Sequence, residues 1–270
     1  MQTRAKTLTA LFMACAAWPA LADVTPEEVW QNWQDASAAM GQTVVAASVA
    51  RDGDVLTIDT VTIASAAGGV TSEGSIAQIL MQDQGDGTVL VTMSPDYPIT
   101  MRLPPIDAGK PEVELNIKVT QTDLRMVASG DGDAISYDLT APTITMKLDR
   151  IEGAAGQAAS LTVDATMTDI AGTYTTRKTD AGLTADSDLT AGGLALAFVG
   201  ADPVQKSEFR ATASMTDLAM KTTGALLDAG LMASGAPELL AKIDSTSALS
   251  TQTTEFTFDV DEPKGKTTLS

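Results

Sequence analysis

The strongest constraint on the fold is a short phrase that recurs at a nearly constant interval. A threonine, an aspartate and then a leucine or isoleucine stand around Asp123, Asp169 and Asp217, at separations of 46 and 48 residues. A second phrase, Asp-Leu-Thr-Ala, begins at Asp138 and again at Asp188. Repeats of this length are single supersecondary units that bury an apolar face only by stacking on their neighbours. The sequence therefore predicts a repetitive architecture.

The alternation of apolar residues changes phase at each Thr-Asp step. Around Asp169, apolar side chains occupy odd positions over 161–167 and even positions over 170–174. A period of two predicts strands, and a shift of one residue reverses the faces unless the strand absorbs an extra residue as a bulge. The returning strands change phase at Pro142 and at Gly192-Gly193. We therefore expect antiparallel hairpins that bend as units, with strands of roughly 12–15 residues.

A helix is predicted ahead of these strands, over residues 23–41. Thr25 is a candidate N-cap, Glu28 completes a capping box, and Gly41 ends the pattern. Trp30 and Trp33 share one face of this helix. Packing of this face against the sheet is the first interpretation. A helix that binds a partner or lies on a membrane surface is the alternative, although the absence of a Lys/Arg face argues against the membrane.

The fold class is mainly β: a curved antiparallel sheet of long kinked hairpins in repeats of about 46–50 residues, with an N-terminal helix and a short helical insert. Residues 42–111 hold N-terminal hairpins with turns at Asp52-Gly53 and Asp86-Gly87, and residues 112–270 hold the repeated hairpins.

Three segments depart from this pattern within one continuous domain, 23–270. Prolines over 95–111 predict a connection without regular pairing. Leucines over 224–244 predict the helical insert. After the turn at 261–266 the sequence predicts no further strand, because only four residues follow, and we expect the natural protein to continue past Ser270.

The first 22 residues have the three parts of a signal peptide. Arg4 and Lys6 precede an apolar stretch, and Ala20-Leu21-Ala22 is a cleavage site of the small-x-small type. The sequence predicts a periplasmic protein with no transmembrane span after cleavage. An uncleaved anchor and a lipoprotein acylated at Cys15 are the alternatives.

Charge and composition exclude several classes of function. The chain has 35 acidic and 17 basic residues, and its net charge is −18. Nucleic-acid binding needs a basic surface that displaces counterions, so no nucleic-acid partner is expected.

Histidine is absent and the only cysteine is Cys15, which excludes the common nucleophilic triads and His/Cys zinc sites. We predict no enzymatic activity, no cofactor and no metal site. A pair of carboxylates acting as a hydrolase, and a calcium ion bridging the repeated aspartates, stay open.

Methionines cluster near the predicted bends and define a candidate apolar groove: Met126, Met146, Met167, Met215 and Met220. Methionine suits loosely specified apolar surfaces, although it also fills ordinary cores. A single curved sheet leaves its concave face open unless something covers it. The predicted function is therefore binding of a lipid or another apolar ligand. The alternative is a structural or protein-interaction component of the cell envelope, without ligand or catalysis.

Three stretches carry a family resemblance: "ADVTPEEVWQNW" after the signal, the hairpin "GDGTVLVTM", and "TVDATMTDIAG". With them, the chain resembles an uncharacterised family of exported alphaproteobacterial proteins, domain of unknown function 2125 (DUF2125). The resemblance implies export and a longer natural chain, and it supplies no activity, cofactor or site.

Overall fold

The computed structural model describes residues 23–105, 111–152, 160–202, 207–226, 246–262 and 265–269. The first element is helix α1 (Pro26–Ala39). The strands are β1 (Gln42–Asp52), β2 (Val55–Ala67), β3 (Val70–Asp83), β4 (Val89–Met93), β5 (Asp96–Leu103), β6 (Val113–Thr122), β7 (Arg125–Asp131), β8 (Ala134–Glu152), β9 (Ser160–Thr179), β10 (Gly182–Asp202), β11 (Ser207–Leu226), β12 (Thr246–Ser250), β13 (Thr253–Glu262) and β14 (Gly265–Leu269).

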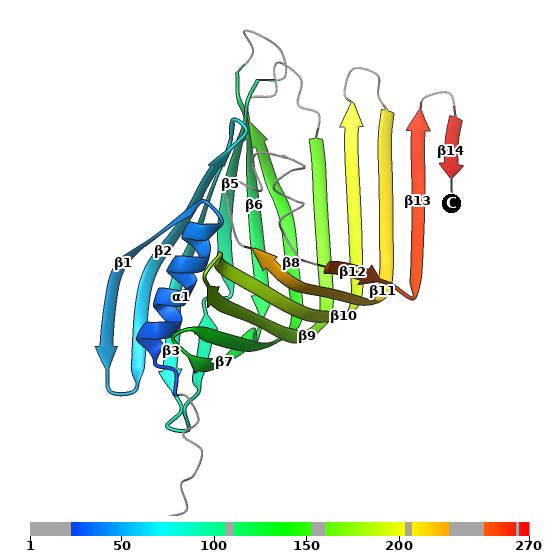
Figure 1. Cartoon of the computed structure of the whole chain (residues 1–270). Helices are drawn as coiled ribbons and strands as arrows, with labels where there is room; N and C mark the ends of the chain where they lie inside the picture. The colour runs from blue at the N-terminus through cyan, green and yellow to red at the C-terminus, as the bar shows by residue number, and fades with distance from the viewer. Residues whose placement is uncertain are drawn as a thin grey trace, which may run out of the picture.

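All the strands belong to one antiparallel sheet that follows the order of the chain (Figure 1). β4 and β5 lie end to end, and both pair with β3. On their other side β4 pairs with β7 and β5 pairs with β6, so β7 and β6 also lie end to end. We call each such end-to-end pair, like each long strand, one line of strands. From β8 onward, each hairpin of the predicted repeat adds two neighbouring strands. This confirms the predicted architecture: the chain repeats because its sheet adds the same bent hairpin again.

A single bend line crosses the whole sheet. In every line of strands the pairing skips a residue or breaks at the same level, and the residues there are Ala47, Thr60, Ala77, Ser94-Pro95, Asp123, Pro142, Asp169, Gly192, Asp217 and Thr251-Gln252. We call the sheet on the side of β4, β7 and β12 the lower arm, and the sheet on the side of β5, β6 and β13 the upper arm (Figure 1). The bend turns the two arms toward each other and makes one face concave.

The backbone conformation at this line explains the recurring aspartates. Asp123, Asp169 and Asp217 have φ values of +48°, +51° and +48°. Most side chains disfavour this left-handed region, whereas the short polar side chain of aspartate tolerates it. The extra residue stays within the ladder as a bulge. β8 to β11 therefore run through the bend as strands of 19 to 21 residues, longer than the predicted 12–15.

Gln121 satisfies backbone groups that the bend would otherwise leave unpaired. Its side chain is buried, and its Nε2 donates to the carbonyl oxygens of Met93 and Ser94 at 3.1 and 3.3 Å. Its Oε1 accepts from the backbone N–H of Leu124 at 2.7 Å. One side chain thus joins the two interrupted lines of strands, β4/β5 and β6/β7, because buried backbone groups need partners.

Thr60 occupies the same bend position with a φ of +50°, although it is β-branched. A left-handed conformation costs such a residue about 1–2 kcal/mol. We predict that Thr60→Gly and Thr60→Asp raise the free energy of unfolding by about 1 kcal/mol in urea titrations. Thr62→Gly, two residues further along the same strand, is the matched control and is expected to lower stability by about 0.5–1 kcal/mol. Equal effects of the two glycine variants would contradict the assigned strain.

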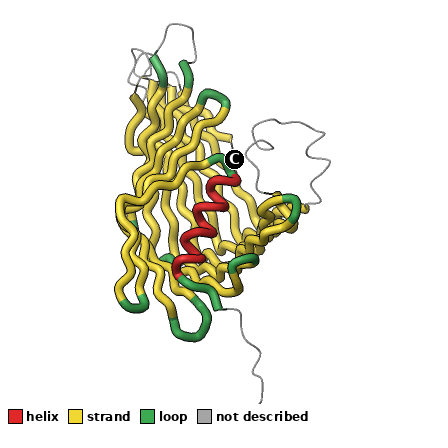
Figure 2. Tube along the Cα trace, turned by 60° about the vertical axis from the view of Figure 1, so that its left-hand side comes forward, coloured by secondary structure: helices red, strands yellow, loops and turns green. Residues whose placement is uncertain are grey.

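Helix α1 lies across the concave face and forms the main core with the lower arm and with the adjoining upper-arm part of β1 to β3, which includes Val61 (Figure 2). Val29 and Trp30 face the sheet. Their partners are buried residues of β2, β3, β4, β7 and β8, namely Leu56, Ile58, Val61, Ile79, Met81, Val89, Val91, Ala128, Ile135 and Tyr137. A smaller cluster around Ala141, Ile170 and Ala191 continues this apolar face across the bend.

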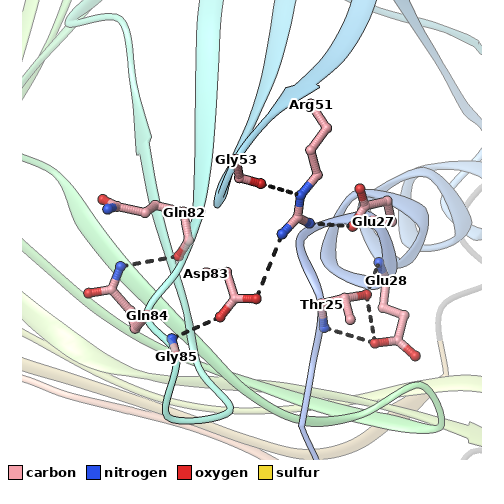
Figure 3. Close-up of polar contacts among 9 residues, drawn as sticks. All are labelled: Thr25, Glu27, Glu28, Arg51, Gly53, Gln82, Asp83, Gln84 and Gly85. Atoms are coloured by element: carbon pink, nitrogen blue, oxygen red, sulfur yellow. Dashed lines mark hydrogen bonds and ion pairs between the residues drawn. The ribbon is translucent and has the colours of Figure 1, made fainter.

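The predicted capping signals are confirmed, and an ion pair joins the helix to the sheet beside them. The Thr25 hydroxyl accepts from the Glu28 N–H, and the Glu28 carboxylate accepts from the Thr25 N–H. Arg51 of the edge strand β1 reaches Glu27 at 2.8 Å and Asp83 at 3.7 Å, as Figure 3 shows. These contacts fix the beginning of the helix over the turns of the first hairpins.

Three predictions about connections need correction or fall on residues that are not described. The proline-containing segment holds a regular strand, β5, because Pro98 stands where the pairing with β3 has ended and pairs only with Lys118 of β6. β14 pairs with β13, so the chain does form a further strand after the turn. Of the predicted helical insert 224–244, residues 224–226 belong to β11 and the remainder lies outside the described residues, as does the predicted signal peptide 1–22.

Candidate functional site

The upper arm presents an apolar surface on the concave face, which we call the inner face because α1 lies on it. Strand pairing places inward side chains side by side. Across β8 to β13 one such row is Met146, Ala165, Leu196, Ala213 and Phe256. A second row, from β9 to β13, is Val163, Phe198, Ala211 and Phe258. None of these side chains is charged.

Much of this surface is open to solvent. The helix contacts β1, β2 and β3, and its packing reaches the lower arm of β8 and β9. Phe256 is 59% exposed, and Met146 and Phe209 are each 40% exposed. Large apolar side chains that gather on one open surface are typical of an interaction site rather than of scattered surface residues.

The ion pairs of the upper arm lie on the opposite, outer face. Lys147 and Asp164 are paired there at 3.8 Å, as are Arg102 and Glu114 at 3.1 Å. A shallow depression of about 290 Å³ also lies on the outer face, with Ala195 as part of its floor. Alanines contribute much of its lining, and the carboxylates of Asp164 and Glu255 lie among the residues around it.

The five predicted groove methionines divide between the core and the open surface. Met146, Met167 and Met215 lie on the inner face of the upper arm, beside or near the bend. Met220 is on the inner face of the lower arm, opposite Leu189, and is 42% exposed. Met126 packs into the core with α1. The structure therefore places three of the five together on the open upper arm.

Sequence reasoning missed the aromatic part of this surface. Phe209 and Phe256 are exposed large side chains of this surface, and Leu161 lies in the same row as Phe209, on the other side of Gly200. The sequence did contain a signal for the aromatic residues of β13. Phe256 and Phe258 alternate with Glu255 and Thr257, which indicates one apolar and one polar face.

The two tryptophans of the predicted partner helix pack on the sheet. Trp30 is 8% exposed within the core, and Trp33 packs against the same cluster, with its ring 6.5 Å from that of Tyr137. The side chain of Asn32 is buried between them and the sheet. The structure thus uses this helix face to hold the two layers together.

Asn32 is the centre of a buried polar network that the sequence did not indicate. Its Oδ1 accepts hydrogen bonds from the Tyr137 hydroxyl at 2.8 Å and from the Thr176 hydroxyl at 3.1 Å. Buried polar groups are costly unless they are paired, so this network fixes the helix at one position on β8 and β9.

Burial raises the pKa of Tyr137 well above the ordinary tyrosine value of about 10. Because the unfolded state loses its proton first as the pH rises, the folded state binds more protons there and is destabilised at alkaline pH. We predict that stability falls above about pH 10, and that Tyr137→Phe reduces this fall while costing about 1 kcal/mol at pH 8 through the lost hydrogen bond. Urea titrations of both proteins between pH 8 and 11 test this, and parallel pH curves would contradict it.

Within the described parts of the chain, no group of three or more carboxylates is arranged to hold a metal ion. Over the same residues, no helix combines the length and apolar character that a bilayer crossing requires. Comparison of the chain with protein-family models, curated proteins and solved structures finds no match. The resemblance to DUF2125 and the predicted export therefore stay predictions.

Proposed function

We propose that this protein binds a lipid or another apolar molecule on the inner face of the upper arm, in the periplasm. The observation that supports the proposal is the contrast between two parts of one apolar face. α1 covers that face on the lower arm, whereas Phe256, Phe209 and Met146 stay exposed on the upper arm. Exposing such side chains to water is unfavourable by roughly 25 cal/mol per Å², so an apolar ligand would gain that free energy on binding.

Charge supports the same proposal. The protein has a net charge of −18, yet the two inner rows of the upper arm contain no charged residue. Paired charges such as Lys147 and Asp164 are confined to the outer face. The inner face is thus suited to hydrocarbon and would not hold an ionic group.

A fluorescent fatty-acid analogue titrated into the purified protein tests the proposal. Phe256→Asp places a carboxylate on the inner face and is expected to weaken binding at least tenfold, because a buried unpaired charge is costly. Thr257→Asp places the same charge one residue away on the outer face of β13 and is the matched control, with unchanged affinity expected. No binding by the unaltered protein, or an equal loss in both variants, would count against the proposal.

A protein-interaction component of the envelope is the second candidate, and the edge strand β1 favours it. β1 pairs only with β2 among the described strands, and its residues 42–50 include no charge and no proline. Natural sheets usually protect such an edge, because an unprotected strand can pair with another chain. A protein that takes up no fatty-acid analogue but forms a stable complex through β1 would favour this candidate.

A further inference from the structure

β1 ends the sheet on one side, at the left of Figure 1, and one of its edges pairs with no other described strand. We call it the open edge. Val45 lies on the outer face of this strand and is 57% exposed, and Val49 lies on the inner face and is 48% exposed. The backbone groups and apolar side chains of the open edge are therefore available to a further strand.

A strand that pairs with the open edge on both arms must itself bend opposite Ala47. Wherever two continuous described strands cross the bend side by side, one has a residue with positive φ there and the other does not. Thr60 of β2 has this conformation and faces both Ala47 of β1 and Ala77 of β3, neither of which has it. Asp169 of β9 faces Gly192 of β10 in the same way. The neighbour that fits β1 therefore carries a positive-φ residue opposite Ala47.

β3 shows how such a strand lies on the open edge. β1 and β3 run in the same direction on either side of β2, and the edge of β3 that corresponds to the open edge of β1 is the one that pairs with β2. A strand built like β2 therefore fits the open edge in the register that β2 has on β3. This register places its bend residue opposite Ala47 and the residue five positions earlier opposite Asp52.

Backbone conformation and charge select a different protein over a second copy of this chain. Two β1 strands side by side would both lack a positive-φ residue at the bend, and the described strands that have one are already paired along both edges. Two chains of net charge −18 also repel each other. Asp52, at the lower end of the open edge, is exposed and takes part in no ion pair among the described residues, so a basic residue suits the position opposite it.

We propose that the open edge of β1 binds a bent, extended segment of a partner protein, which extends the sheet by one strand. The residue of this segment opposite Ala47 is glycine, asparagine or aspartate, which tolerate positive φ. Apolar residues lie opposite Val45 and Val49, and a lysine or arginine lies opposite Asp52. The inference goes beyond apolar binding on the upper arm, does not depend on it, and specifies the partner for the protein-interaction candidate.

A fluorescently labelled peptide with the sequence of residues 55–66, carrying Val55→Lys, Thr60→Gly and Thr62→Val, tests the proposal. Anisotropy titrations should show one peptide bound per protein, and amide hydrogen exchange should slow in residues 42–52 but not in β14. A peptide with valine at the bend position should bind about tenfold more weakly, because positive φ is costly for a β-branched residue. A peptide without the bend residue should bind at least as weakly, since its side chains then reach the wrong face on one arm.

Variants of the protein locate the contact. Asp52→Lys should weaken binding of the lysine peptide up to about fivefold, the range of an exposed ion pair, and a peptide with glutamate at that position should recover the affinity. Glu255→Lys makes the same change of net charge on β13 and should leave binding unchanged. Val45→Lys places a charge on the open edge and should weaken binding at least about tenfold. Thr62→Lys, directly opposite on the outer face of β2, is its matched control.

Three results would overturn the proposal: equal affinity for the glycine and valine peptides, slowed exchange elsewhere than in β1, or a dimer of the unaltered protein that Val45→Lys dissociates. Absence of peptide binding would also overturn it, while leaving apolar binding on the upper arm intact. Peptide binding without uptake of a fatty-acid analogue would instead overturn the apolar-ligand function and support this inference.

Discussion

Replacing Trp30 by alanine is expected to lower the free energy of unfolding by about 3–5 kcal/mol, the usual cost of truncating a buried tryptophan. Trp30 is 8% exposed and is part of the cluster that joins α1 to the lower arm. Among the described residues, α1 is the element that covers the sheet at this position, so the cavity would weaken the whole contact between helix and sheet. Urea unfolding monitored by far-ultraviolet circular dichroism measures the change.

Gln31→Ala is the control for this prediction. Gln31 is the next residue of the same helix, it is exposed, and among the described residues its side chain bonds to Asp35 alone. A substitution of this kind usually changes stability by no more than about 0.5 kcal/mol. If Trp30→Ala cost as little as Gln31→Ala, the helix would not be docked as described.

Deleting Asp169 is expected to destabilise the protein by at least about 4 kcal/mol. The deletion removes the extra residue of the bulge, so residues 170–179 must either reverse their faces or lose their pairing. Ile170, Tyr174 and Thr176 would then leave the inner face, and each of the larger side chains is worth about 1.5–3 kcal/mol when buried. A change in the turn after Thr179 could restore the pairing of β9 with β10 but not its pairing with β8, which runs along the other edge of β9.

The matching substitution keeps the residue count and the bend. Asp169→Gly retains the bulge, and glycine adopts a φ of +51° without strain, so a change of less than about 1 kcal/mol is expected. Soluble yield and urea midpoints of the two variants make the comparison. A deletion variant as stable as Asp169→Gly would show that the phase change at Asp169 does not set the register.

The bent hairpins were predictable because their signal is local and repeated. The phase change at Asp169 recurs at Asp123 and Asp217, and each instance lies within a few residues of the chain. The bend at Thr60 gives the same signal, since Leu56 and Ile58 are followed by Val61 and Ile63, but it lacks the aspartate that draws attention to the others.

The structural features that the sequence did not predict depend on contacts between residues far apart in the chain. Asn32 meets Tyr137 and Thr176 across more than a hundred residues, and no spacing in the sequence marks it. Gln121 acts on carbonyl groups of Met93 and Ser94, which the bend alone brings near.

The candidate site was likewise predictable only in part. The methionines near the bend were predicted from the repeat, but whether each is covered depends on where α1 lies. The helix covers Met126 and leaves Met146 and Met215 on the upper arm. The inner row of Leu196, Ala213 and Phe256 could be recognised only from the register of three strands.

The most direct test of the central claim is a comparison of native and denaturing mass spectra of the protein isolated without detergent. If the upper arm binds an apolar ligand, the native mass should exceed the denatured mass, and extraction should release acyl lipid at close to one lipid per protein. Equal masses, together with no uptake of a fluorescent fatty-acid analogue, would contradict the claim and leave the protein-interaction candidate.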